Sequence, residues 1–285
     1  MKRKILAVIL AVLTLGAVLV SCGGAQMRMG TGGTGGTYYA FGGVLSQYIK
    51  NNAGINCVAV STDGSKANIQ GVASGDYQLG TVQSDVMAYA WDGTNTFAKD
   101  GKVDGFRVIG GLYGEAVQVV TMDPSIKSIA DLKGKSVSIG APGSGVFFNA
   151  IDMLAAAGLT ESDIMAQYLS FNDSADGLKD GKIDAAFIVA GPPTPAITEL
   201  TTTTGATLVP IDGEIADKVM ASCPYYTKYT IPAGTYNGQE TDIVTVAVKA
   251  TLIVSADADE ETVYNITKAI FDNAEAIAAE NAKGA

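Results

Sequence analysis

The sequence repeats one local pattern: a short strand, a glycine-rich loop and an amphipathic helix. In the first half, residues 27–29 lead into the loop 30–37, and apolar residues then recur at intervals of three and four. In the second half, residues 136–139 lead into the loop 140–145, and apolar residues recur from Phe147 at the same intervals. This periodicity predicts one helix with a buried face in each half. A chain that repeats this unit is expected to form two similar α/β lobes.

The similarity between the halves continues downstream. Further strands are predicted at 58–61, 79–82, 168–170 and 185–189. Ser65 and Ser174 each lie four residues after a strand-ending serine, a position that suits the N-cap of a helix. Strands that alternate with helices predict parallel sheets with right-handed crossovers. We therefore expect a bilobed α/β clamp.

Two long apolar segments are candidates for the connections between the lobes. Residues 116–122 are expected to cross outward, and the β-branched segment 241–254 is expected to return. A helix is predicted at 257–279, with Asp257 and Glu260 as a capping box at its start. The expected organisation is a leader at 1–21, a first lobe at 22–119, a second lobe at 120–229, and a return crossing with a packed helix at 230–285.

The N-terminus has the pattern of a lipoprotein signal peptide. Three basic residues precede the uncharged segment 5–18, which is short for a membrane span of about 20 residues. Leu19 to Gly23 (LVSCG) then fits the motif in which Cys22 is acylated and becomes the new N-terminus. An uncleaved anchor is the alternative. Acylation would tether the protein on the extracytoplasmic face of the cell membrane, through its lipid alone.

Charge and composition exclude several functional classes. The chain has no histidine, so the commonest general base and metal ligand are both absent. Acidic residues outnumber basic ones by 29 to 19, the wrong sign for a nucleic-acid binder. Cleavage before Cys22 would leave Arg28 and Arg107 as the only arginines. Cys57 and Cys223 are predicted to be buried thiols, with a long-range disulfide as the alternative.

The loop at 30–35 formally matches the dinucleotide fingerprint GxGxxG. The second strand, however, ends in Ser61-Thr62, without the acidic residue that would hold a ribose hydroxyl. We therefore predict neither a nucleotide nor any other cofactor, and no metal. The glycines would still allow a ligand to approach the backbone N–H groups of a helix N-terminus, which favour anions.

Five segments together are similar to the TAXI-type solute receptors of TRAP transporters. They are GTGGTGGTYY at 30–39, VQSDV at 82–86, IKSIADLKGKSVSIGAPGSG at 126–145, YTKYTIPAGTY at 226–236 and TVAVKATLIV at 245–254. The resemblance implies a type II periplasmic-binding-protein fold, no enzymatic activity, and delivery of a solute to an ion-gradient-driven TRAP permease. The implied solutes are small carboxylates, including glutamate-like and glutamine-like amino acids. The segment from Tyr113 to Glu115 (YGE), followed by Gln118, departs from the usual family pattern.

The candidate ligand site combines the two glycine loops with the strand ends beside them. Asp85 is expected either to pair with an α-ammonium group or to cap the next helix. Tyr38 and Tyr39 are candidates for the cleft wall, and Tyr236 is a candidate for either a hinge or a ligand role. The remaining candidates are Gly35, Gly36, Thr37, Ser65, Gln83, Ser84, Gly143, Ser144, Gly145 and Gly191. A ligand-sensing domain and an extracytoplasmic enzyme that uses carboxylate pairs are the alternatives to a transport receptor.

Overall fold

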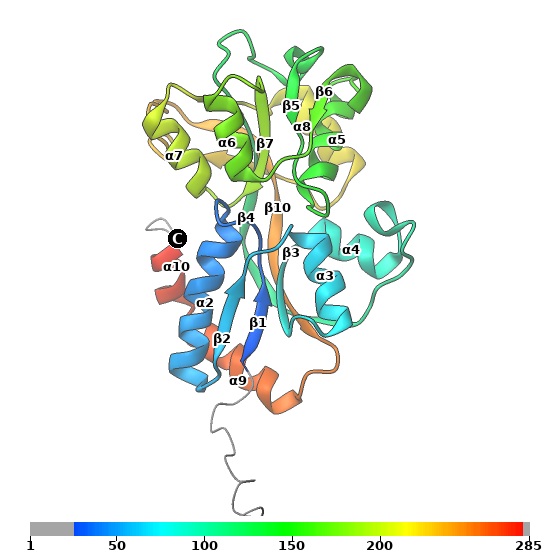
Figure 1. Ribbon diagram of the computed structural model, residues 1–285, viewed down its shortest axis with the longest axis vertical. Helices are drawn as coiled ribbons and strands as arrows, with labels where there is room; N and C mark the ends of the chain where they lie inside the picture. The colour runs from blue at the N-terminus through cyan, green and yellow to red at the C-terminus, as the bar shows by residue number, and fades with distance from the viewer. Residues whose placement is uncertain (1–25, 282–285) are drawn as a thin grey trace, which may run out of the picture.

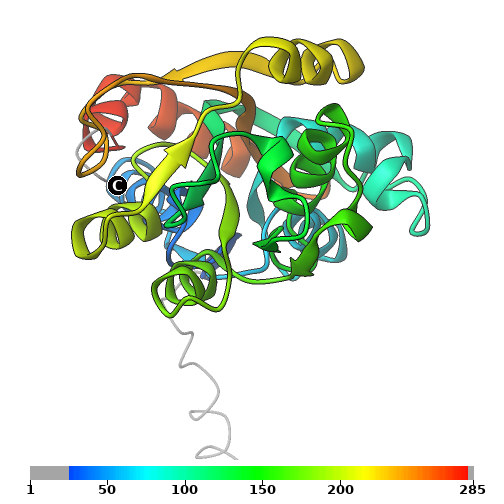
Figure 2. The ribbon, with the colours of Figure 1, turned by 90° about the horizontal axis from the view of Figure 1, so that it is seen from above.

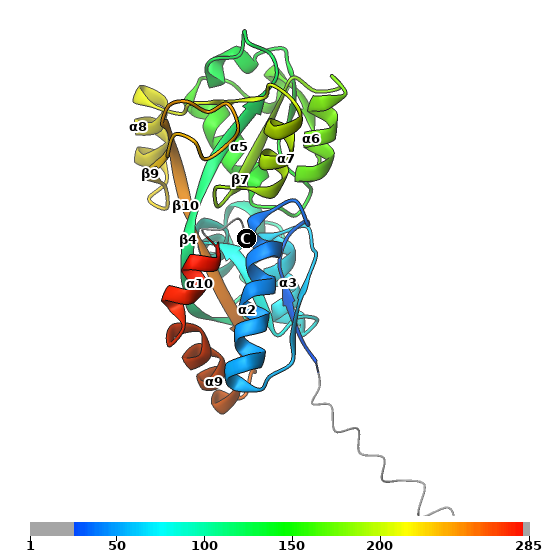
Figure 3. The ribbon, with the colours of Figure 1, turned by 90° about the vertical axis from the view of Figure 1, so that its left-hand side faces the viewer.

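A computed structural model describes residues 26–281 and shows two α/β lobes, one above the other in Figure 1. Lobe 1 is built from elements near both ends of the described chain. They are β1 (Met27–Gly30), α2 (Thr37–Ala53), β2 (Cys57–Val60), α3 (Ser65–Ser74), β3 (Leu79–Gln83), α4 (Ser84–Asp92), the 3-10 turn η1 (Asn95–Phe97), α9 (Glu260–Phe271) and α10 (Ala274–Asn281). Figure 3 shows α2, α9 and α10 along one side of this lobe.

Lobe 2 is built from the middle of the chain. Its elements are η2 (Ile129–Leu132), β5 (Ser136–Ser138), α5 (Val146–Ala156), η3 (Glu161–Asp163), β6 (Met165–Gln167), α6 (Phe171–Lys179), β7 (Ala185–Ala190), α7 (Pro195–Thr203), β8 (Thr207–Val209), α8 (Gly213–Ser222) and β9 (Thr227–Ile231). Seen from above, in Figure 2, helices lie on both sides of this lobe's sheet. This architecture confirms the predicted type II periplasmic-binding-protein-like fold.

Two long strands, β4 (Phe106–Thr121) and β10 (Ile243–Ser255), run through both lobes. The strands form one sheet in the order β2-β1-β3-β10-β4-β7-β5-β6, and β8 and β9 add to β4 and β10. In lobe 1, β10 lies antiparallel between β3 and β4, whereas β1 pairs in parallel with β2 and β3. The two predicted crossings are therefore present. The predicted division at residues 119 and 229 stays a prediction, because β4 and β10 belong to both lobes.

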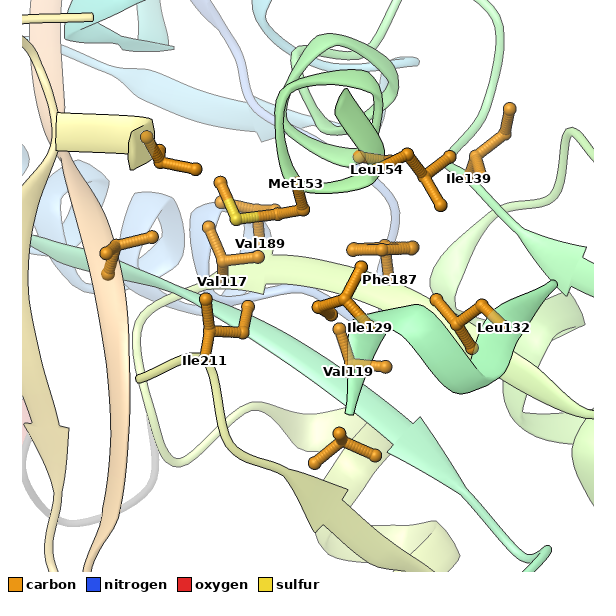
Figure 4. Packing of buried hydrophobic residues seen from close by; sticks show 14 of the residues in the cluster. Val117, Val119, Ile129, Leu132, Ile139, Met153, Leu154, Phe187, Val189 and Ile211 are labelled. Carbon is orange, nitrogen blue, oxygen red and sulfur yellow. The ribbon is translucent and has the colours of Figure 1, made fainter. Parts of the chain in front are cut away.

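The core of lobe 2 follows from the alternation of side chains along β4. Val117 and Val119 point to one face of the sheet and pack with α5 and α8, as Figure 4 shows for the labelled cluster. Ala116 and Val120 point to the other face and pack with residues of α6 and α7. A strand with both faces covered is expected to be apolar on both, which explains the run from Ala116 to Val120, in which the buried Gln118 is the one polar residue.

Three local predictions need correction. The strand expected at 168–170 is β6, three residues earlier, and Ser170 is the N-cap of α6, where its Oγ accepts a hydrogen bond from the Asp173 N–H. Ser174 therefore lies inside that helix. Ser65 begins α3 instead of capping it, because its Oγ accepts a hydrogen bond from the Gln83 N–H at the end of β3.

The helix predicted at 257–279 is divided into α9 and α10. It begins later than expected because Asp259, two residues after Asp257, accepts the hydrogen bond from the Thr262 N–H at 2.9 Å and is the N-cap. Cys57 and Cys223 are buried free thiols, as predicted, so the alternative of a disulfide is not realised. Cys22 and the leader lie outside the described residues. Within residues 26–281, no helix is both long enough and apolar enough to cross a membrane.

Candidate functional site

A cleft lies between the two lobes, where helix N-termini from both of them meet. It is bordered by the starts of α2 and α3 from lobe 1 and of α5 and α6 from lobe 2. Its lining residues are Gly32, Gly33, Gly36, Thr37, Tyr38, Thr62, Asp63, Gly64, Ser65, Gln83, Glu115, Ala141, Ser144, Gly145, Val146, Leu169, Ser170, Phe171, Val189 and Ala190. The first N–H groups of a helix have no partner within it, and the helix dipole adds partial positive charge there. Four such termini give the cleft donors for an anionic group.

Glycines at these termini allow the lobes to approach closely. A Cβ on Gly35 would lie 2.0 Å from the Asn172 Oδ1 of lobe 2, and a Cβ on Gly145 would lie 1.4 Å from the Gln83 Oε1 of lobe 1. Gly36, the N-cap of α2, has no side chain to occupy the position in front of the first-turn amides. The glycines of these loops therefore allow both the close contact between the lobes and the approach of a ligand to the backbone.

Direct hydrogen bonds join the lobes around the cleft. The Thr37 Oγ1 donates to the Gly191 carbonyl at 2.6 Å, and the Ala196 N–H donates to the Gly35 carbonyl at 3.0 Å. On the opposite side, the Lys66 N–H donates to the Gly143 carbonyl at 3.2 Å. The structure therefore shows the two lobes in contact on two sides of the cleft, as in the closed form of a clamp.

A buried polar network reinforces the closed contact behind the cleft. The Gln83 Nε2 donates to the Asn149 Oδ1 at 2.8 Å, and the Asn149 Nδ2 donates to the Asp85 Oδ2 at 3.0 Å and to the Tyr226 hydroxyl at 2.7 Å. That hydroxyl donates to Asp152 at 2.9 Å. Asp85 is fully buried, and desolvation raises its pKa to about 6, against the opposing effect of its hydrogen bonds.

Glu115 is the buried carboxylate that lines the cleft. It lies on β4, is 1% exposed, and its Oε2 accepts a hydrogen bond from the Tyr38 hydroxyl at 2.8 Å. Desolvation is the main cause that raises its pKa well above the usual value for a glutamate, and the negative charge of Asp85 adds to it. The other charged residue of the lining is Asp63, which is exposed. The described lining thus contains two acidic residues and neither lysine nor arginine.

The two arginines of the described residues lie elsewhere. Arg28 stacks over the Tyr77 ring and donates to the Asp76 carbonyl, and Arg107 donates to backbone carbonyls of Asp104 and Phe106. Neither lines the cleft. An anionic group in the cleft would therefore be held by backbone N–H groups and hydroxyls, without an arginine clamp.

The structure brings half of the predicted site residues to the cleft. Those that line it are Gly36, Thr37, Tyr38, Ser65, Gln83, Ser144 and Gly145. The others do not line it: Gly35, Tyr39, Ser84, Asp85, Gly143, Gly191 and Tyr236. Of these, Gly35, Gly143 and Gly191 supply carbonyls to the lobe contacts, and the Ser84 Oγ accepts from the Lys249 N–H. Their roles in binding stay predictions.

Tyr236 and Asp85 have structural environments that sequence reasoning did not foresee. The Tyr236 hydroxyl accepts from the Thr194 N–H and donates to the Gln118 Oε1, deep in lobe 2. Asp85 is the second residue of α4, and the N-cap of that helix is Gln83. Sequence reasoning also did not include Glu115 among the site residues. The signal available for it was a lone acidic residue within an otherwise apolar crossing strand.

Residues 29–284 match the NMT1-like family, so the chain belongs to that family. Solved structures of binding proteins have the same fold at low identity. The alkanesulfonate-binding protein SsuA from Xanthomonas axonopodis pv. citri, bound to MOPS, is 18% identical, with 90% of this chain and 78% of that chain covered and a TM-score of 0.55. The arginine-specific periplasmic binding protein STM4351 from Salmonella typhimurium is 12% identical, with 91% and 99% covered and a TM-score of 0.55. The substrate-binding protein of an amino acid ABC transporter is 16% identical, with 91% and 96% covered and a TM-score of 0.52.

These findings contradict the assignment to the TAXI-type receptors of TRAP transporters. The matching family is described as NMT1-like, and one of the similar structures is titled as the binding protein of an ABC transporter. The motifs quoted for the assignment lie at the loops and crossing strands of the fold. A glycine loop before a helix and a long apolar return strand are features that binding proteins of this architecture use whichever permease they serve.

Proposed function

We propose that the protein is an extracytoplasmic solute receptor, not an enzyme, which captures a small molecule bearing a carboxylate and presents it to a membrane permease. The observation that carries the proposal is the cleft between the two lobes, bordered by four helix N-termini. Backbone N–H groups there favour a carboxylate by charge-assisted hydrogen bonds, each contributing about 1.5–3 kcal/mol. The amino acid binder of an ABC transporter among the similar structures supports an ABC-type permease as the partner.

The size of the cleft supports a small solute. Its free volume is about 90 Å³. That is several times the roughly 10–15 Å³ a cavity needs to hold one water, and it leaves room for a small solute such as an amino acid or a short organic acid.

The side chains of the cleft favour a receptor over an enzyme. Ser65 and Ser144 are the serines that begin α3 and precede α5, and their hydroxyls bond to backbone groups of Gln83 and Ala141. Neither has a general base as a hydrogen-bond partner within the described residues, and activation of a serine requires one. A ligand-sensing domain would have the same cleft. Delivery of the solute to a permease is what distinguishes the proposed receptor from a sensing domain.

A thermal-shift panel tests the receptor proposal. The mature protein would be heated with each L-amino acid, with 2-oxo acids and with dicarboxylates. A solute at a hundredfold excess over its Kd should stabilise the folded state by about 2.7 kcal/mol and raise Tm accordingly. If no member of the panel raises Tm, the solute class is wrong.

Tethering through Cys22 is a further part of the proposal. Because acylation needs the thiol, Cys22→Ser should move the protein from the membrane fraction to the soluble fraction after cell lysis. Solute binding should stay unchanged, because the cleft lies in the described lobes. A Cys22→Ser protein that still sediments with membranes would contradict the lipoprotein prediction.

A further inference from the structure

The cleft contains hydrogen-bond acceptors without a partner among residues 26–281. Tyr38 donates to the Oε2 of Glu115, and the Oε1 of Glu115 makes no hydrogen bond in this part of the chain. The Oε1 of Gln83, a second lining residue, is buried and also without a partner there. Buried polar groups are normally paired, so unpaired groups at a cleft call for a complementary group on the ligand. For Gln83 and for an ionised Glu115, the complementary group is a donor.

The charge of the cleft points to the same chemistry. Glu115 has no cationic partner among the described residues, and none of its neighbours in the lining is basic. An ionised carboxylate buried without a cation is strongly destabilised, so it either stays protonated or pairs with a positive charge. A protonated nitrogen of the ligand would supply that charge and the missing donor together.

We infer that Glu115 forms a subsite for a protonated nitrogen of the solute, in the same cleft as the helix N-termini that receive its carboxylate. This inference rests on the proposed receptor function and narrows its solute to molecules that carry both groups. Dicarboxylates and 2-oxo acids of the same size are then poor ligands, because they place a second acceptor or an anion beside Glu115. Asp85, for which an ammonium partner was expected, does not line the cleft: it accepts a hydrogen bond from Asn149, which in turn accepts one from the lining residue Gln83.

Substitution of Glu115 tests the subsite. Glu115→Gln keeps the shape of the side chain and removes its negative charge. For the L-amino acid that binds the wild type best, affinity measured by calorimetry should fall about 10- to 150-fold, the loss expected for a charge-assisted hydrogen bond. For the 2-oxo acid with the same side chain, affinity should stay the same or rise.

Two control variants separate this role from general effects of charge. Glu240→Gln removes an exposed acidic residue of lobe 2 and should leave both affinities unchanged. Asp63→Asn removes the exposed acidic residue of the cleft. If Asp63→Asn abolishes the preference for the amino acid and Glu115→Gln does not, the assignment to Glu115 is overturned.

A measurement on the wild type keeps the test independent of whether a variant folds. Burial raises the pKa of Glu115, and Tyr38, Tyr113 and Asp85 are the titratable groups that face it. A cationic group beside Glu115 would lower that pKa, so binding should release protons, and affinity should rise with pH through the range above the usual glutamate value. Calorimetry in phosphate and in Tris, which differ in ionisation enthalpy, measures this release.

The outcomes distinguish failure of the receptor function from failure of the Glu115 subsite. If no solute of any class binds the wild type, the receptor function itself fails. If a 2-oxo acid binds as tightly as the matching amino acid, or if binding releases no proton near neutral pH, the receptor stands and the Glu115 subsite is refuted.

Discussion

At the scale of single residues, Asp85 has an unusual environment for a charged group. It lies at the contact between the lobes, fully buried, with Asn149 as the donor to one oxygen and no partner within the described residues for the other. Its pKa is about 6, above the usual value of 3.8, because burial disfavours the charged form. The folded protein therefore binds a proton at this group in a pH range in which the unfolded chain does not.

Asp85→Asn should change the pH dependence of stability. Between pH 4 and 6 the folded state holds the extra proton, so the contribution of Asp85 is most favourable below pH 4 and is lost as pH rises through 6. The neutral asparagine avoids that loss. We expect the variant to gain about 1–3 kcal/mol in free energy of unfolding at pH 8 relative to the wild type, with little difference at pH 4.

Urea unfolding of both proteins at the two pH values is the measurement. An equal difference between wild type and variant at pH 4 and pH 8 would show that the ionisation of Asp85 does not contribute. The same variant also tests the expectation of an ammonium role, since its affinities for amino acids and for 2-oxo acids should both stay as in the wild type if Asp85 only supports the lobe contact.

At the scale of elements, the α5 helix depends on a glycine at its N-cap. Gly145 faces Gln83 of the other lobe so closely that a Cβ would also lie 2.8 Å from the Val86 side chain. Gly145→Ala should therefore push the lobes apart and break the Gln83–Asn149 hydrogen bond, while each lobe keeps its own core. Overpacking typically costs about 1–3 kcal/mol, so the affinity for solute should fall about 5- to 150-fold.

Calorimetry on Gly145→Ala and on a matched glycine variant checks this. Gly43→Ala is the control, because Gly43 lies in the middle of α2, and a Cβ there would meet nothing within 4 Å. The control should bind normally and be slightly more stable, since alanine favours helix. Unchanged affinity of Gly145→Ala would mean that closure does not use this contact.

The elements could be predicted from sequence wherever a local signal determines them. The periodicity after each glycine loop predicted α2 and α5, and the β-branched run at 241–254 predicted β10. The site could be predicted only in part, because its other members meet through contacts between distant segments. Glu115 and Tyr38 are 77 residues apart, and Gln83 and Asn149 are 66 residues apart. Whether Asp85 faces the cleft or lies behind it depends on how the lobes pack, which no local pattern encodes.

At the scale of the whole molecule, the closed arrangement predicts a change of shape on binding. Lobe contacts flank the cleft on two sides, so we expect a solute to enter a more open form and then to favour the closed one. We expect the hinge in β4 and β10, the strands that join the lobes, whose pairing shifts register between Lys249 and Thr251. A pair of strands whose hydrogen-bond ladder is already interrupted bends at a lower cost in free energy.

Small-angle X-ray scattering measures this change directly. The radius of gyration should decrease when the best solute of the panel is added to the wild type. Gly145→Ala should decrease less at saturating solute, because its lobes cannot approach fully. A wild-type scattering curve that is identical with and without a saturating solute would show that the protein is closed before it binds.

The central position of β10 also determines when the protein can fold. In lobe 1, β10 lies between β3 and β4, yet about 160 residues separate it in sequence from β3. The sheet of lobe 1 is therefore incomplete until Ser255 has been synthesised, whereas the strands and helices of lobe 2, from β5 to β8, are contiguous. Lobe 2 is expected to form first along the emerging chain, and lobe 1 stays incomplete until the chain is nearly finished. If the chain is exported, as the proposed function requires, this late closure of lobe 1 would keep that part of the polypeptide unfolded, and so competent to cross the membrane, through most of its synthesis.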